Sequence, residues 1–293
     1  MTIAAGAVQA GSRADTPSPG KASYFLSICD FSHRSWDDPI VFPGKPRLSH
    51  NHTFVGNVST NAFSTLTSLR AHGTTCDPQA DTAAYWAPTL LLNDKPLLPV
   101  GATIYYRRLT TAPVRPFPPG LRMVGGNSRA WRAQSVQVIY WDCSVVKATR
   151  YGPNGGLASS VPPTSGMVAF STVPSCPATS TLQLHVNFPD CWNGKSLDSP
   201  NHKSHMAYSA NGRCPQSHPV AVPALSLVYR YRPPGPGVVI LSSGGQYSGH
   251  ADFINAWNQH ALTQLILTCL DNRPGPTQYD DKHFQTSQLY NQC

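Results

Sequence analysis

The sequence predicts a mainly β protein: a disulfide-stabilised β-sandwich or jelly-roll-like single domain with long loops and one principal C-terminal helix. Short apolar runs rich in β-branched and aromatic residues recur between turn signals, as in sandwich proteins. Pro and Gly, which supply those turns, number 28 and 22. Glutamate is absent, so all 14 acidic residues are Asp, which favours caps and turns over helix interiors.

Six segments after the opening run "YFLSICDF" have the composition of strands. They are 88–94, 102–109, 135–144, 182–191, 224–233 and 237–245. Within the fourth, Gln183, His185 and Asn187 alternate with apolar residues, which suits one buried face. Two Pro/Gly-rich stretches, 113–127 and 150–166, are predicted as long loops, and the second is a candidate insertion or flap.

The principal helix is predicted over 248–270, "SGHADFINAWNQHALTQLILTCL". Its apolar residues follow helical spacing and form a core stripe. They are Phe253, Ile254, Trp257, Ala261, Leu262, Leu265 and Cys269. Ser248 or Asp252 is expected to cap the start.

Three regions are expected along the chain: 1–22 as a disordered leader or signal-peptide remnant, 23–272 as the single β-rich domain, and 273–293 as an irregular tail. "TIAAGAVQA" resembles the end of a secretory apolar region, with Val8-Gln9-Ala10 as a cleavage site. No stretch is apolar enough to span a bilayer.

The eight cysteines are scattered without a CxxC pair, which favours disulfides over a zinc or redox motif. Disulfides place the chain outside the cell or in a periplasm. Because Cys191 and Cys214 flank a polar segment, we expect them to pair and to close a loop over it. Proximity in sequence suggests the other pairs: Cys29 with Cys76, Cys143 with Cys176, and Cys269 with Cys293.

The net charge of +8 suits anionic partners, an acidic polysaccharide among them, although a solvated basic surface explains it equally well. Without a Lys/Arg run or a basic helix, nucleic acid is not expected as a partner. We expect a monomer.

Ionisable residues are crowded into "DCWNGKSLDSPNHKSHMAY", residues 190–208. Pro200 excludes a long helix, and one turn would bring His202 and His205 to the same side. The candidates here for acid–base or electrostatic roles are Asp190, Lys195, Asp198, His202, Lys203 and His205. The alternative is a packed loop whose Asp and His residues hold backbone turns.

Two further segments carry candidate histidines. His50 and His52 are two apart, so in a strand both imidazoles point to one side and could serve one metal or one anion. His250 and Asp252 lie at the expected helix start, where a neutral His is favoured; Asp252 could equally be only a cap. We predict that His50, His52, His202, His205 and His250 line one cleft or sheet edge.

Several blocks in order resemble one family: "SHNHTFVGN", "PFPPGLRMVGG", "FPDCWNGKSLDSPNHKSHMAYS", "CPQSHPVAVPALSL" and "YSGHADFINAW". They are similar to secreted fungal and actinobacterial proteins known as domain of unknown function nineteen-ninety-six (DUF1996), over roughly 27–269. The resemblance implies an extracellular location, often beside carbohydrate-related modules in fungi, and no established reaction. The family usually has Asp where this chain has Asn193, so a carboxylate there is not an obligatory catalyst.

These residues favour a secreted protein that acts on or binds cell-wall or other extracellular polysaccharide, with acidic polysaccharide among the candidates. Hydrolysis would need two Asp, from Asp190, Asp198 and Asp252. Elimination would use a His, Lys or Tyr side chain as the base. The abundance of these residue types in the candidate segments favours elimination over hydrolysis. Trp192, Tyr208 and Arg122 are expected to bind substrate. The alternatives are a non-catalytic carbohydrate-binding or wall-associated module, and a divalent-metal site built from His50, His52, His202 or His205.

Overall fold

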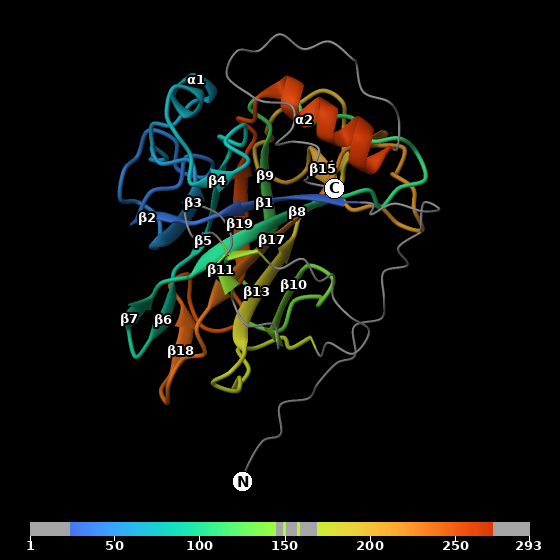
Figure 1. Ribbon diagram of the computed structural model, residues 1–293. Coiled ribbons are helices and arrows are strands. Elements are labelled where there is room, and N and C mark those ends of the chain that lie inside the picture. The colour runs from blue at the N-terminus through green and yellow to red at the C-terminus, as the bar shows by residue number, and fades with distance from the viewer. Residues whose placement is uncertain (1–23, 145–148, 151–156, 159–168, 272–293) are drawn as a thin grey trace.

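Two antiparallel sheets packed face to face form the body of the protein in this computed structural model, which describes residues 24–144, 149–150, 157–158 and 169–271 (Figure 1). The larger sheet has the strand order β10-β13-β17-β8-β1-β4. Its strands are β1 (Tyr24–Cys29), β4 (Cys76–Asp77), β8 (Gly101–Arg107), β10 (Ile139–Ser144), β13 (Thr181–Asn187) and β17 (Ala224–Tyr231).

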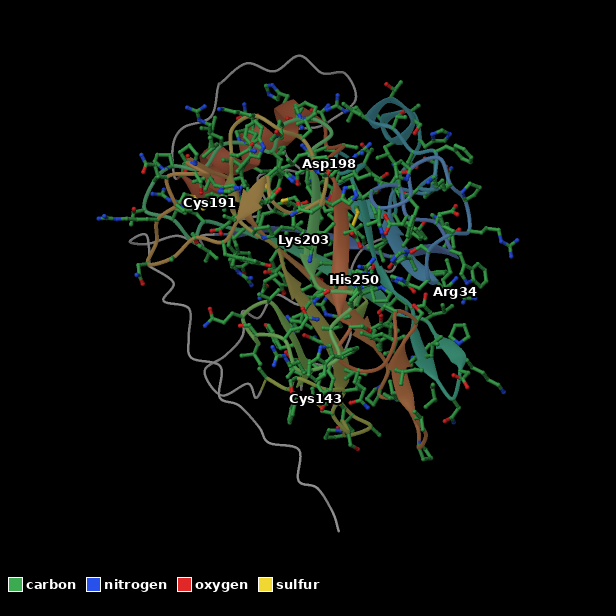
Figure 2. All side chains as sticks on the ribbon, turned by 180° about the vertical axis from the view of Figure 1, so that it is seen from behind. Arg34, Cys143, Cys191, Asp198, Lys203 and His250 are labelled. Atoms are coloured by element: carbon green, nitrogen blue, oxygen red, sulfur yellow. A yellow bond between two sulfur atoms is a disulfide. The ribbon has the colours of Figure 1, made fainter. Side chains whose placement is uncertain are left out.

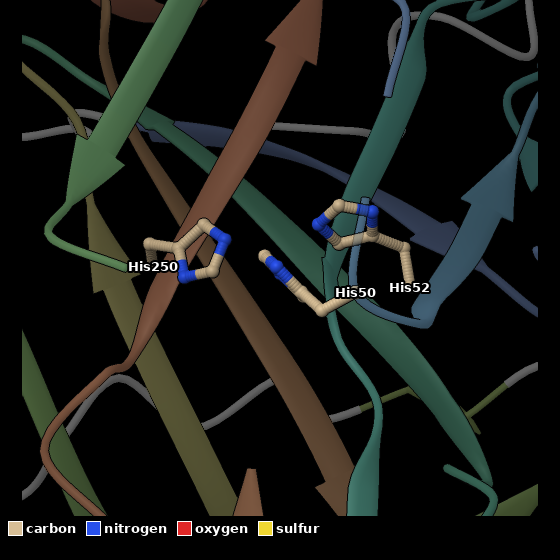
Figure 3. Close-up of side chains that lie close together, drawn as sticks. All are labelled: His50, His52 and His250. Carbon is tan, nitrogen blue, oxygen red and sulfur yellow. The ribbon is translucent and has the colours of Figure 1, made fainter. Parts of the chain in front are cut away.

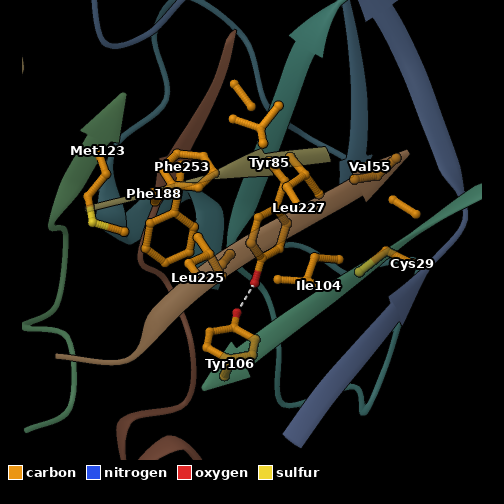
Figure 4. Close-up of a cluster of buried hydrophobic side chains, with 14 of the residues drawn as sticks. Cys29, Val55, Tyr85, Ile104, Tyr106, Met123, Phe188, Leu225, Leu227 and Phe253 are labelled. Atoms are coloured by element: carbon orange, nitrogen blue, oxygen red, sulfur yellow. Dashed lines mark hydrogen bonds between the residues drawn. The ribbon is translucent and has the colours of Figure 1, made fainter. Parts of the chain in front are cut away.

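The second sheet has five strands in the order β2-β3-β5-β19-β9. They are β2 (Phe31–Ser35), β3 (His52–Gly56), β5 (Ala84–Pro88), β9 (Arg122–Gly126) and β19 (His250–Ile254). Because side chains alternate between the two faces of a strand, Tyr85 and Phe253 of the second sheet point into the core between the sheets. There they pack with residues of the larger sheet that include Ile104 and Tyr106 (Figure 4). The predicted mainly β, sandwich-like fold is confirmed.

Small elements complete the described part of the chain. Short strands form three further sheets: β11 (Thr149–Arg150) with β12 (Leu157–Ala158); β14 (Cys191–Trp192), β15 (Met206–Ala207) and β16 (Val220–Ala221); and β6 (Leu90–Leu92), β7 (Lys95–Leu97) and β18 (Val239–Leu241). The helical elements are α1 (Leu66–Arg70), α2 (Gln259–Leu265) and a π-helical turn, η1 (Ile266–Leu270).

The prediction of one helix over 248–270 is wrong in its first half. Helix α2 begins at Gln259, and its cap is Asn258, whose side chain accepts hydrogen bonds from the backbone N–H groups of His260 and Ala261. His250–Ile254 is instead strand β19, hydrogen-bonded on both sides by β5 and β9. Its apolar residues satisfied helical spacing, but long-range strand pairing decided the structure. Asp252 is therefore not a helix cap.

The predicted loop 113–127 also needs correction, because its last residues form strand β9 (Arg122–Gly126). The last residue of this strand, Gly126, has a backbone conformation and a close neighbour that require glycine. Its φ is +79°, and an added Cβ would lie 2.6 Å from the carbonyl oxygen of Gly249. Only glycine therefore suits this position beside β19.

Among the described residues three disulfides tie the fold together, and all three match predicted pairs: Cys29–Cys76, Cys143–Cys176 and Cys191–Cys214. The last closes the loop that carries His202 and His205. The proposed partner of Cys269, the leader 1–22, the tail 273–293 and most of the predicted flap at 150–166 lie outside the described residues.

Candidate metal centre

Three histidine side chains meet on the outer face of the five-stranded sheet (Figure 3). Ring centroids are 4.2 Å apart for His50 and His52, 4.9 Å for His50 and His250, and 5.9 Å for His52 and His250. His52 and His250 are buried, and His50 is half-buried. We call these three residues the histidine cluster.

Strand register explains why these residues converge. His52 pairs with Pro88 of β5, and Asp252 pairs with Trp86, two positions earlier on the same strand. Continuing the antiparallel register places His250 beside Pro88 as well. His52, His250 and Asp252 thus project from one face of neighbouring strands, and His50 follows because it lies two residues before His52.

Backbone carbonyls fix the tautomer of two of the imidazoles. Nδ1 of His52 donates to the carbonyl oxygen of Asp37 at 3.0 Å, and Nδ1 of His250 donates to that of Ser248 at 2.8 Å. A carbonyl only accepts, so each Nδ1 carries a proton and each Nε2 presents a lone pair. Among the described residues, Nε2 of His50 and Nε2 of His52 have no hydrogen-bond partner.

Burial keeps the cluster neutral. It lowers the pKa of His50 to about 4 and that of His250 to about 3, and it holds the pKa of His52 well below its usual value. The neighbouring imidazoles lower the pKa of His52 and His250 further. The imidazoles are therefore uncharged near neutral pH, which is the state that binds metal ions.

Two aspartates flank the cluster. Asp252 is 1 % exposed, and neither carboxyl oxygen has a hydrogen-bond partner within the described ranges. Its Oδ2 lies 4.0 Å from Nε2 of His250. Asp38 accepts two backbone N–H bonds on Oδ1, from Ile40 and Val41, both at 2.9 Å. Burial, together with nearby Asp38, raises the pKa of Asp252 well above its usual value.

The donor atoms are close enough to share one ion. Those of His50, His52 and His250 all lie within 4.8 Å of one another, and so do those of Asp38, His52 and Asp252. Sequence reasoning did not select Asp38. The one sequence feature that could have indicated Asp38 is the Asp37-Asp38 pair, in a chain with only 14 acidic residues.

A cleft of about 210 Å³ borders the histidine cluster. Val124 and Gly126, which pair with Asp252 and His250, form part of its wall, and His202, Lys203 and Tyr208 line it. Nζ of Lys203 donates to the carbonyl oxygen of Gly126, and Figure 2 shows Lys203 above His250. Lys203 lowers the pKa of both His250 and Asp252, so its charge acts on the cluster.

The segment 190–208 divides into cleft residues and structural residues. His205 is buried, with Nε2 donating to the carbonyl oxygen of Arg122 at 2.7 Å and Nδ1 2.9 Å from the hydroxyl of Ser199. The buried carboxylate of Asp190 accepts hydrogen bonds from Ser209 N and Oγ. Neither residue points into the histidine cluster, and both hold the loop in place.

The remaining predicted residues lie around this loop. Nδ1 of His202 is 3.0 Å from Oδ1 of Asp198, whose Oδ2 is 3.4 Å from Arg122. Lys195 is exposed, and Trp192 donates from Nε1 to the carbonyl oxygen of Ser196. The structure places His250, rather than His202 or His205, beside His50 and His52, and metal binding by any of these histidines stays a prediction.

The chain belongs to the family described as Domain of unknown function (DUF1996), whose family model matches residues 38–257. The matched range contains every residue of the histidine cluster and both flanking aspartates. No curated protein and no solved structure matches the chain significantly.

Proposed function

We propose that this DUF1996 protein holds a divalent transition-metal ion through Nε2 of His50, His52 and His250, with Asp252 as a carboxylate ligand. We further propose that it acts on extracellular polysaccharide at this centre. The supporting observation is the meeting of three neutral imidazoles, two of which, His52 and His250, also lie near the buried carboxyl group of Asp252, which has no hydrogen-bond partner in the described part of the chain.

The donor set fits a metal ion better than it fits a proton network. Ligating histidines usually donate their other ring N–H to a backbone carbonyl or carboxylate, as His52 and His250 do here. Imidazole and carboxylate ligands suit Zn²⁺, Cu²⁺, Ni²⁺ and Fe²⁺. An ion of charge +2 would also offset the cost of burying the Asp252 carboxylate.

When bound, such an ion would polarise a substrate oxygen or lower the pKa of a coordinated water. The surrounding chain supplies the rest of the site. Lys203, beside both His250 and Asp252, brings a positive charge for an acidic group of the sugar. Tyr208 and Gln134 offer polar atoms along the adjoining cleft, where a saccharide would bind.

The proposed extracellular location rests on the three disulfides, because such bonds persist in oxidising compartments. The described helices include none with the length and hydrophobicity needed to cross a bilayer.

A non-catalytic glycan-binding role is the second candidate, and exposed tryptophans favour it. Trp131 is 80 % exposed and Trp36 is 49 % exposed, each with an arginine over its ring. Such rings can stack on sugars. In contrast, Trp86 and Trp257 are buried, and Trp257 was predicted for the core.

Metal analysis tests the proposal directly. Protein stripped with a chelator is titrated with Zn²⁺ and, separately, Cu²⁺ by calorimetry, and the metal content of untreated protein is measured by elemental analysis. We expect one ion per chain in the wild type and none in His50→Ala or His250→Ala. His72→Ala, which removes an exposed histidine, is the matched control and should bind normally. Absence of stoichiometric binding in the wild type would disprove the metal centre.

A further inference from the structure

The cleft that borders the histidine cluster contains a histidine whose ring is oriented by a carboxylate. Nδ1 of His202 lies 3.0 Å from Oδ1 and 3.1 Å from Oδ2 of Asp198. Because a carboxylate accepts hydrogen bonds, Nδ1 carries the proton and Nε2 keeps its lone pair. No described residue forms a hydrogen bond with Nε2 of His202, whose side chain lines the cleft and is 25 % exposed. This basic nitrogen is therefore open to a ligand.

The carboxylate of Asp198 is itself held in place. Its Oδ1 accepts the backbone N–H of Ser199 at 2.8 Å, and its Oδ2 lies 3.4 Å from Nη1 of Arg122 on β9. The backbone of His202 is fixed as well, because its N–H donates to the carbonyl oxygen of Ser199 at 2.7 Å. The loop thus orients the imidazole through a carboxylate, as in enzymes where a carboxylate-oriented histidine transfers a proton.

Lys203, the next residue, lines the same cleft. Its Nζ donates to the carbonyl oxygen of Gly126, which leaves two of its three N–H groups for a ligand. A lysine ammonium beside an imidazole suits a substrate that carries a carboxylate. Pairing the carboxylate with this charge makes the neighbouring C–H group more acidic, because the negative charge that develops on the carboxylate is stabilised.

The other described residues that line the cleft offer no further acid–base group. Tyr208 donates its hydroxyl proton to the carbonyl oxygen of Asn187 at 2.9 Å. None of the described residues in the cleft wall is an aspartate, and the chain has no glutamate. Hydrolysis by paired carboxyl groups therefore lacks its residues there. Elimination needs a base and a positive charge, and His202 and Lys203 supply both.

We propose that this cleft cleaves a polyuronate by β-elimination, with His202 as the single proton-transferring residue; the choice of a polysaccharide rests on the proposed function. Lys203 binds the carboxylate of the uronate and stabilises the negative charge that develops on it. Nε2 of His202 removes the proton from C5, the electron pair forms the C4=C5 double bond, and the C4–O bond breaks. The same nitrogen then gives its proton to the departing oxygen, while Asp198 positions the ring.

The reaction balances because the proton taken from C5 ends on the leaving oxygen, and His202 returns to its starting state. One residue can perform both transfers only when the C5 hydrogen and the C4 oxygen lie on the same side of the sugar ring. They do so in D-glucuronate and D-mannuronate, and they lie on opposite sides in D-galacturonate. The single histidine therefore predicts which polyuronates are cleaved.

The test incubates the full-length protein, as purified and after addition of Zn²⁺, with polyglucuronate, polymannuronate and polygalacturonate. Ultraviolet absorbance follows the conjugated double bond, and mass spectrometry shows whether the products contain an added water. We expect unsaturated products without added water from polyglucuronate or polymannuronate, and none from polygalacturonate.

Two variants remove the imidazole without new backbone strain, because Gly and Asn both tolerate the φ of +56° at His202. His202→Gly and His202→Asn should each lower the rate by about 100-fold or more. Added imidazole should restore part of the rate of His202→Gly, where the missing side chain leaves space for it. His72→Gly, at an exposed histidine outside the cleft, is the matched control and should keep its rate with or without imidazole. Thermal melts establish that the variants are folded.

Steady-state kinetics separate the roles of the neighbouring residues. Asp198→Asn should lower kcat about tenfold or more while KM stays the same, because the ring loses its orientation and the polymer still binds. Lys203→Gln should raise KM, because the carboxylate of the uronate loses its partner.

Zinc titration of His202→Gly separates this inference from the metal centre, and this variant should bind zinc as the wild type does. If zinc binds and no polymer yields unsaturated product, the elimination is wrong and the metal centre stands. If elimination occurs in a protein that binds no zinc, the metal centre is wrong and the elimination stands. Products with an added water, cleavage of polygalacturonate alone, a wild-type rate in either His202 variant, or failure of imidazole to restore any of the rate would also overturn the elimination.

Discussion

The ring centroids of His50 and His250 lie 4.9 Å apart and meet edge to face, although one residue precedes β3 and the other begins β19. Strand β5 stands between those two strands and pairs with both. The contact therefore depends on the register of three strands. A one-residue slip in either pairing would turn the side chains of one strand to the opposite face and dismantle the cluster.

Replacing Asp252 with Asn should separate metal binding from folding. The Asn amide is close to the Asp carboxyl group in shape, and neither oxygen of Asp252 makes a hydrogen bond to the described residues. The free energy of unfolding of the metal-free protein should therefore change by only about 1 kcal/mol or less. Zinc affinity, measured by calorimetry, should fall at least about tenfold. Asp198→Asn, outside the cluster, is the control; equal zinc affinities in both variants would exclude Asp252 as a ligand.

His205 and His202 should differ in their effect on stability. His205 is buried with both ring nitrogens engaged, so His205→Ala should lower the unfolding free energy by roughly 1–3 kcal/mol in urea titrations. His202 has a φ of +56°, which Asn tolerates well. His202→Asn should therefore cost less than about 1 kcal/mol. A reversed order would contradict the division of the loop into structural and cleft residues.

Removing the Cys191–Cys214 disulfide should loosen the loop that carries the cleft residues. The bond closes a segment with a sequence separation of 23, so Cys191→Ser with Cys214→Ser should cost about 3 kcal/mol. Limited proteolysis should then cut within 191–214. The matched variant, Cys143→Ser with Cys176→Ser, removes a disulfide elsewhere and should leave this loop protected. Equal protection in both variants would show that other contacts hold the loop.

Asp81 should make stability depend on pH. Burial raises its pKa from 3.8 to about 7, although hydrogen bonds from Tyr85 and the backbone N–H of Ala83 oppose that shift. The folded state thus binds the proton more tightly than the unfolded chain. The stabilisation is fully present below about pH 4 and is lost as pH rises to about 7, on the order of 4 kcal/mol for this group.

The contribution of Asp81 is isolated by comparing urea unfolding of the wild type and Asp81→Asn across this pH range. The wild type should lose stability relative to the variant as pH rises. Identical pH profiles would show that Asp81 is ionised at the same pH in the folded and unfolded chains.

The sequence by itself determined the β-rich class and much of the disulfide framework. Alternating apolar and polar residues indicate strands wherever one face is buried, as in "LQLHVN", whose Leu182, Leu184 and Val186 face the core. Three predicted cysteine pairs are present because the partners are neighbours along the chain, and short loops are the easiest to close. His50 and His52 were predicted to share a side because the period of a strand is two.

Only the tertiary structure decided which histidines meet. His250 joined the cluster because β19 pairs with β5 and β9, and those hydrogen bonds join residues far apart in sequence. The same long-range pairing replaced the predicted helix start with a strand. His205 was predicted for the site, yet its partner is the backbone of Arg122, which no local pattern reveals. Burial, which makes the cluster neutral, arises only when distant segments pack together.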